Sequence, residues 1–104
     1  MDKADFDIDV HGHIVRIPGW VKSEDIAIIV GYTETANELM ERAKNLKRRK
    51  LLLEAGNCYA SELDKLSREA ESKARNLINN AVNVVYLASI EYGPDSKLTL
   101  KRME

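Results

Sequence analysis

Two histidines near the N-terminus have the residue type and the spacing for metal chemistry. On a straight strand over residues 5–13, Asp9, His11 and His13 would project from one face at a spacing of about 6.6 Å. Asp5 and Asp7 would share that face. Imidazole and carboxylate groups are ligands for zinc, nickel or manganese. The pattern is that of a divalent metal site, for zinc or nickel, at His11, His13 and Asp9. We favour the other interpretation, a solvated face whose aspartates protect a strand edge from aggregation, and keep the metal site as a hypothesis.

A run of basic residues near the middle of the chain is the second candidate for a binding site. Clusters of this kind bind the phosphate backbone of nucleic acids. Here the charges spread around a predicted helix, and no aromatic residue lies among them to stack on a base. We therefore expect a solvated helix end, and we keep a nucleic-acid-associated regulatory module as the alternative function. The residues concerned are Lys44, Lys47, Arg48, Arg49 and Lys50.

No arrangement of nucleophile, base and cofactor-binding residues in the sequence indicates an enzyme. Cys58 is the single cysteine, and a lone loop cysteine seldom has a catalytic role, because a reactive thiol also needs a base beside it. The sequence has no Walker loop, no dinucleotide-binding fingerprint and no serine nucleophile elbow. We therefore favour a non-enzymatic protein, and we keep a metal-dependent enzyme built on His11, His13 and the aspartates as a third interpretation. We assign no cofactor apart from the divalent metal considered above.

Length and composition point to one small domain over residues 1–104. Of the 104 residues, 44% are hydrophobic and 32% are charged, which suffices for one core. The net charge of -1 gives no general attraction to nucleic acids or to anionic membranes. We expect no secretory signal, since the first residues are acidic, and no membrane span, since no window holds about 18 apolar residues. With no internal disulfide, the expected location is the cytoplasm.

The first half of the chain contains signals for two or three strands and a helix. Residues 5–10 alternate between acidic and apolar side chains, as a half-buried strand does, and Gly12 suits a turn before extended chain at residues 14–17. The apolar run at residues 26–30 fits a strand or a buried helical turn, and we favour the strand. Thr35 and Glu38 form a capping-box signature, which predicts a first helix from Thr35.

The second half contains signals for another helix and then two strands. Gly56 suits a left-handed helix stop, and a second helix is expected to begin near residues 59–61. Apolar residues recur every three or four positions up to Ala81, but every second position from Val82 to Tyr92, which predicts a strand. The turn signal Gly93-Pro94-Asp95 then predicts a last strand that holds Leu98 and Leu100.

The predicted fold is α+β, a small, mostly antiparallel sheet with two helices packed on one face, in the order β-β-(β)-α-α-β-β. A strand over residues 82–92 would be apolar on both faces, because Val85 and Leu87 lie on the second one. Such a strand usually has cover on both sides, and so short a chain supplies cover for one. We therefore predict a homo-oligomer, with Trp20 and Tyr86 as interface residues. The predicted function is that of a self-associating domain that binds a small ligand or metal at a subunit interface.

Two short motifs resemble those of a known family. One is Ile14-Val15 followed by Gly19, Val21 and Glu24, and the other is Tyr59-x-x-Glu62-Leu63-x-Lys65. They are similar to the strand-turn-strand and the helix start of the YbjQ-like family of small bacterial and archaeal heavy-metal-binding domains. The family's Gly-Gly-Arg-Ser loop is reduced here to Gly56-Asn57-Cys58, and its terminal strand is missing. The resemblance implies an α+β fold with the helices on one side of the sheet, and ring-like oligomers, often pentameric.

Overall fold

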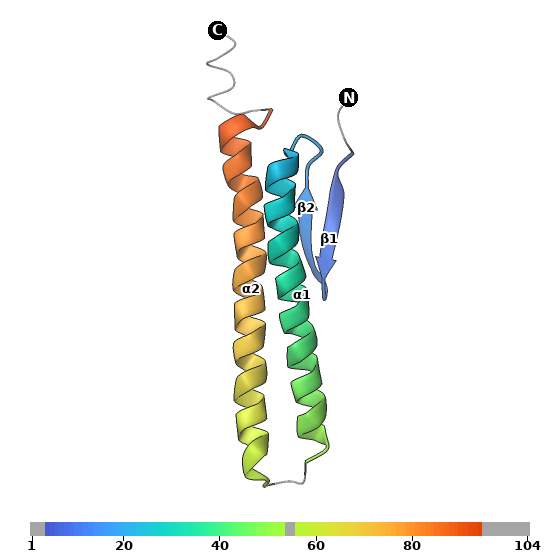
Figure 1. Cartoon of the computed structure of the whole chain (residues 1–104), viewed down its shortest axis with the longest axis vertical. Helices are drawn as coiled ribbons and strands as arrows, with labels where there is room; N and C mark the ends of the chain where they lie inside the picture. Colours follow the sequence, from blue (N-terminus) through green and yellow to red (C-terminus); the bar gives the residue numbers. More distant parts are fainter. Residues whose placement is uncertain (1–3, 54–55, 95–104) are drawn as a thin grey trace.

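The computed structural model describes residues 4–53 and 56–94. Its elements are β1 (Phe6–Val10), β2 (His13–Ile17), α1 (Ser23–Leu51) and α2 (Cys58–Tyr92). The two helices run antiparallel, side by side, and the β1–β2 hairpin lies against one end of this pair (Figure 1). The chain is therefore α+β, as expected. The predicted order with further strands is wrong, because long helices form the scaffold and the described part of the chain has a single two-stranded sheet.

The two predicted N-terminal strands are confirmed, but a tight turn joins them. β1 and β2 pair antiparallel, and Val10 opposite His13 closes the ladder. His11 and Gly12 form the turn with φ angles of 49° and 91°. Positive φ at both central residues is what a two-residue type I′ hairpin needs, and its twist matches that of the strands. The carboxylate of Asp9 accepts a hydrogen bond of 2.8 Å from the Gly12 amide. A straight strand over residues 5–13 is therefore wrong.

The first helix begins twelve residues before the predicted start at Thr35, at Ser23. Glu24 and Asp25 lie in its first turn, where negative charge favours the amino end of the helix dipole. The predicted strand at residues 26–30 is wrong, because this run is helical and buries Ile29 against the core. The Thr35 hydroxyl donates a hydrogen bond to the carbonyl of Gly31 inside the helix, so it caps nothing.

The second helix begins as expected but ends much later. Asn57 caps it, because its side chain accepts a 2.9 Å hydrogen bond from the Tyr59 amide. Gly56 has the left-handed conformation that the sequence predicted, with a φ of 85°. The predicted strand at residues 82–92 is wrong, since α2 continues to Tyr92. The predicted last strand with Leu98 and Leu100 lies outside the described residues.

Buried residues line the contact between the helices at a seven-residue spacing, and all of them except Ile29 are small. The buried residues of α2 include Ser67, Ala74, Ala81 and Ala88, and those of α1 include Ile29, Ala36 and Ala43. This is the heptad spacing of a coiled coil. The side chains of Asp25 and Tyr92 are hydrogen-bonded between the helices. Ala36 follows Asp25 on α1 by as many residues as Ala81 precedes Tyr92 on α2. Ala36 and Ala81 therefore lie at the same height along the helix pair. Side chains this small permit a close approach of the two helix axes.

The heptad also explains why residues 82–92 are helical in spite of their β-branched and aromatic side chains. Ala81 and Ala88 continue the buried row across the predicted boundary, and Val84 and Val85 pack against the core. Strand propensity amounts to about 1 kcal/mol at most per residue and depends on context. The burial of a continuous helical face decides the outcome here.

The core lies where the β-hairpin meets the two helices. Its buried members are Val10, Val15, Ile17, Val21, Ile29, Ala36, Ala74, Ile78 and Ala81.

The molecule can be divided into two halves. The hairpin half comprises the hairpin, residues 23–37 of α1 and residues 76–92 of α2. The loop half comprises residues 38–51 of α1 and 58–75 of α2. Within the described residues, neither helix has a stretch long and apolar enough to cross a membrane.

Candidate functional site

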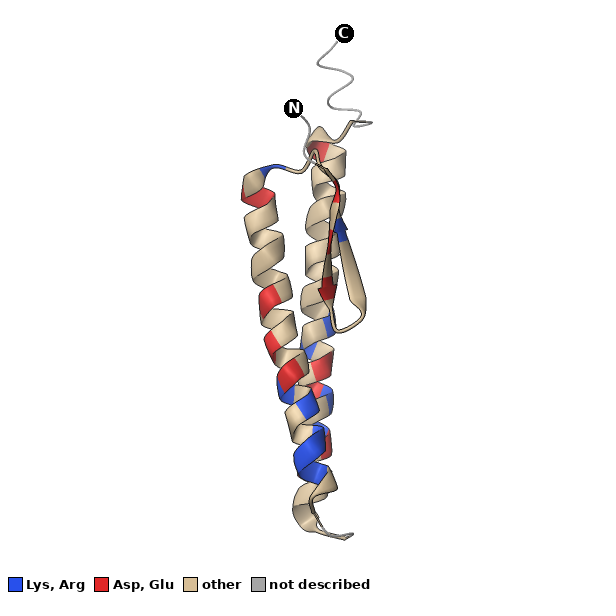
Figure 2. Ribbon diagram, turned by 90° about the vertical axis from the view of Figure 1, so that its right-hand side faces the viewer, with Lys and Arg blue, Asp and Glu red and all other residues tan. Residues whose placement is uncertain are grey.

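Charge is distributed unequally between the two halves of the helix pair. The segment of α2 from residue 76 to residue 90 has no Asp, Glu, Lys or Arg, and neither does α1 from residue 26 to residue 33. Figure 2 shows the charged residues of the helices gathered mainly in the loop half. A water-exposed helix normally carries charges along its outer face. The hairpin half of α2 departs from this pattern.

The outer side of this segment is exposed, and apolar side chains lie on it beside uncharged polar ones. Asn79, Val82, Asn83, Tyr86 and Leu87 are all exposed, and their spacing of three and four residues places them on one face of the helix. We call these five residues the uncharged face. The exposed fractions are 46% for Val82, 63% for Tyr86 and 61% for Leu87. Clustered apolar groups of this kind mark interaction surfaces more often than scattered ones do.

The two predicted interface residues have different surroundings. Tyr86 belongs to the uncharged face and is open to a partner. Trp20 is partly buried and packs against the core. Its ring meets that of Tyr92 edge to face, with centroids 5.7 Å apart. Trp20 therefore contributes to the packing within this chain, whereas the side chain of Tyr86 is exposed to solvent.

A cluster around Tyr92 joins the carboxyl end of α2 to the start of α1. The Tyr92 hydroxyl donates a hydrogen bond to the Asp25 carboxylate and accepts one of 3.1 Å from the Lys22 amide. The Lys22 ammonium lies 4.5 Å from the centre of the tyrosine ring. Burial, followed by the hydrogen bond to Asp25, raises the pKa of Tyr92 above its ordinary value. These contacts hold the hairpin half of the helix pair together.

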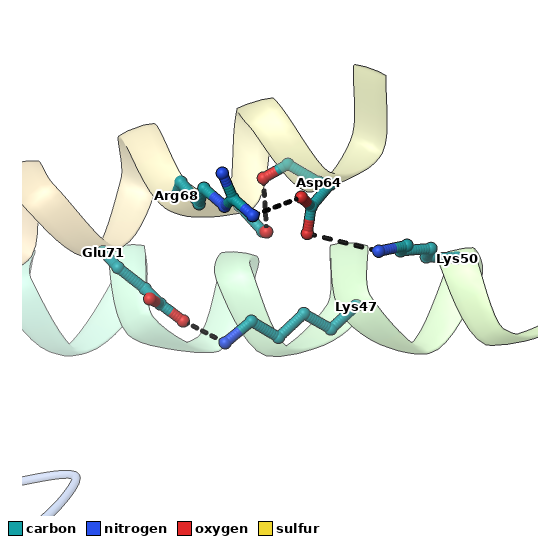
Figure 3. Close-up of polar contacts among 6 residues, drawn as sticks. Lys47, Lys50, Asp64, Arg68 and Glu71 are labelled. Carbon is teal, nitrogen blue, oxygen red and sulfur yellow. Dashed lines mark hydrogen bonds and ion pairs between the residues drawn. The ribbon is translucent and has the colours of Figure 1, made fainter. Parts of the chain in front are cut away.

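The basic run at residues 44–50 is partly engaged within the molecule. Lys47 forms an ion pair with Glu71 of α2, and Lys50 lies 3.3 Å from the carboxylate of Asp64, which Arg68 also contacts at 2.9 Å (Figure 3). Two of the five predicted nucleic-acid contacts therefore bridge the helices. Lys44, Arg48 and Arg49 are exposed. This pairing could not be predicted from the sequence, because it depends on how the two helices are aligned.

A second apolar region lies at the far end of the loop half. A pocket of about 480 Å³ is lined by Leu52, Leu53, Tyr59, Leu63 and Leu66, with Arg49 and Glu62 at its margin. The fold brings these residues together from the two sides of the connection between the helices. Nothing on this pocket indicates the chemistry of a ligand beyond its apolar character.

The predicted metal ligands are separated by the hairpin turn. The imidazole of His11 lies 3.3 Å from the carboxylate of Glu41 on α1, and the Asp9 carboxylate is bonded to the turn. His13 begins β2 and is exposed. Among the described residues, no three His, Cys, Asp or Glu side chains are grouped as a metal ion would need. Zinc or nickel binding at His11, His13 and Asp9 stays a hypothesis, which calorimetric titration of the full chain would test.

Comparison with known proteins gives no match: no family model, no curated protein and no solved structure is similar to this chain. The resemblance to the YbjQ-like family therefore stays a prediction from two short motifs. The fold and the surface define an α+β protein with a long antiparallel helix pair, one half of which carries an uncharged, exposed face.

Proposed function

We propose that this protein is a non-enzymatic, self-associating domain, and that two copies meet through the uncharged face of α2. The observation that carries the proposal is the exposure of Val82, Tyr86 and Leu87 on a helical segment without a single charge. A charged partner would find no complementary group on this segment. An equally uncharged surface is the better match, and a second copy of the chain supplies one.

The exposed area supports a weak association. The exposed parts of Tyr86 and Leu87 are worth about 2 kcal/mol each on burial, and that of Val82 about 1 kcal/mol. Two copies together would gain about 10 kcal/mol, from which at least about 4 kcal/mol is lost as the translational and rotational cost of association. The dissociation constant is therefore expected to be no tighter than tens of micromolar. The protein would exchange between monomer and dimer as its concentration changes.

The proposal is tested by placing one charge on the uncharged face. Tyr86→Glu would bury a carboxylate without a partner in the dimer, which is strongly unfavourable. The matched control is Tyr59→Glu, because Tyr59 lies on the same helix, is equally exposed at 65%, and belongs to the opposite end of the molecule. Tyr86 also lies more than one turn before the end of α2. At that position the helix dipole has little effect on an added charge.

Sedimentation velocity over a range of concentrations distinguishes these variants. We expect the unmodified chain and Tyr59→Glu to associate with the same dissociation constant, and Tyr86→Glu to remain monomeric with an unchanged helical circular dichroism spectrum. Equal association of Tyr86→Glu and the unmodified chain would contradict the proposal. Loss of association in Tyr59→Glu instead would place the contact at the apolar pocket of the loop half.

A further inference from the structure

We infer that the two copies overlap antiparallel through the hairpin halves of α2 only, so that the two loop halves point in opposite directions. The inference rests on the proposed function, and it specifies how the partner is oriented. Two observations carry it: the length of the uncharged segment, and the identity of the residues that continue its outer face into the loop half.

In an antiparallel pair, the uncharged segments of the two copies can overlap along their whole length. If the two-fold axis passes near Asn83, residue 76 of one copy lies beside residue 90 of the other. The overlap then covers residues 76–90, which is about 22 Å of helix. α2 ends at Tyr92, so each helix stops close to where the charges of the other begin. The contact would contain uncharged residues from one end to the other.

A parallel pair would continue the same face into charged residues, of which Arg75 lies nearest to the uncharged segment. Arg75 and Arg68 lie seven and fourteen residues before Val82, so they share its side of the helix. Both are exposed. In a parallel two-fold dimer each residue near the axis meets its own copy, which would set Arg75 against Arg75 and Arg68 against Arg68. Such like-charge pairs are unfavourable, and the antiparallel arrangement avoids both.

The native cysteine provides the test. Cys58 is exposed, is the single cysteine, and begins α2 at the end farthest from the proposed contact. In the antiparallel dimer each Cys58 lies about 37 Å along the helix from Asn83, so the two thiols are about 75 Å apart. In a parallel dimer they would lie within reach of one short linker, since packed helix axes are about 8–10 Å apart.

The experiment treats the full chain with a short bismaleimide at a concentration where sedimentation shows dimers. We expect no cross-linked dimer from the native chain, and a cross-linked dimer from Cys58→Ser/Asn83→Cys, whose thiols flank the two-fold axis. Cys58→Ser alone is the control and should give no product. Asn83 is exposed, so its replacement leaves the subunit intact.

The outcomes separate the inference from the function that it extends. Cross-linking through Cys58 in a dimeric sample would overturn the antiparallel arrangement and leave self-association standing. A dimer that fails to cross-link through Asn83→Cys would show that another surface is used, which overturns the inference and the proposed face. A chain that sediments as a monomer overturns both.

Discussion

Ala81 is the residue at which the close contact between the helices can be tested most directly. It has no exposed surface, and it lies at the same level as Ala36, which is equally buried. Ala81→Leu adds three carbon atoms where no space is open. Overpacking a well-packed core costs about 1–3 kcal/mol, and we expect the upper part of this range because two small residues face each other. The melting temperature should then fall by about 10–20 °C.

The matched control is Ala27→Leu, because Ala27 lies on α1 and is exposed. Leucine is nearly as good a helix former as alanine, so this change should alter the free energy of unfolding by less than about 0.5 kcal/mol. Urea unfolding followed by helical circular dichroism, at a concentration too low for association, measures both variants. Ala81→Leu with the stability of the control would refute the close approach of α1 and α2.

Further predictions concern the hydrogen bond of Tyr92 and the basic run at residues 44–50. Tyr92→Phe removes the hydrogen bond to Asp25 and should lower the free energy of unfolding by about 1 kcal/mol. Because the pKa of Tyr92 is raised in the folded state, its stabilising contribution is present below the ordinary tyrosine pKa of 10.0 and is lost as the pH rises above it. Urea titrations should therefore show a smaller loss of stability above pH 10.0 in Tyr92→Phe, and equal losses would contradict this reasoning. Fluorescence anisotropy with labelled DNA or RNA should show no binding at physiological salt, because Lys47 is paired and the net charge is -1. Micromolar binding that is lost in the double variant Arg48→Gln/Arg49→Gln would favour a nucleic-acid function instead.

The parts of the fold that local chemistry determines could be predicted from the sequence. The acidic and apolar alternation at residues 5–10 predicted β1, and Gly56 marked the stop that precedes α2. These signals work because a few neighbouring residues determine each strand pattern or turn. Gly12 likewise indicated the place of the hairpin turn.

The two wrong strands, at residues 26–30 and 82–92, have a common cause. A run with apolar residues at most positions fits the period of a strand and that of a buried helix equally well. Which of the two structures forms is decided by the element that the run packs against. One signal was present in the sequence: the small residues Ser67, Ala74, Ala81 and Ala88 keep a seven-residue spacing through the supposed end of the helix. That spacing would have extended α2 to Tyr92.

The candidate surface was less predictable than the fold. Tyr86 was selected as an interface residue on the assumption of a two-faced strand, and the structure places it instead on an exposed helix face. Which apolar residues stay exposed depends on where the β-hairpin lies against the helices, and no local pattern encodes that position. The pairing of Lys47 and Lys50 across the helices was hidden for the same reason.

The native mass of the unmodified chain in solution tests the central claim most directly. Sedimentation equilibrium should give the monomer mass of 11.8 kDa at low micromolar concentration and rise toward twice that value at about 0.5 mM. Such a rise would agree with a weak dimer formed by the exposed part of α2. A mass that stays at 11.8 kDa over the whole range would contradict self-association.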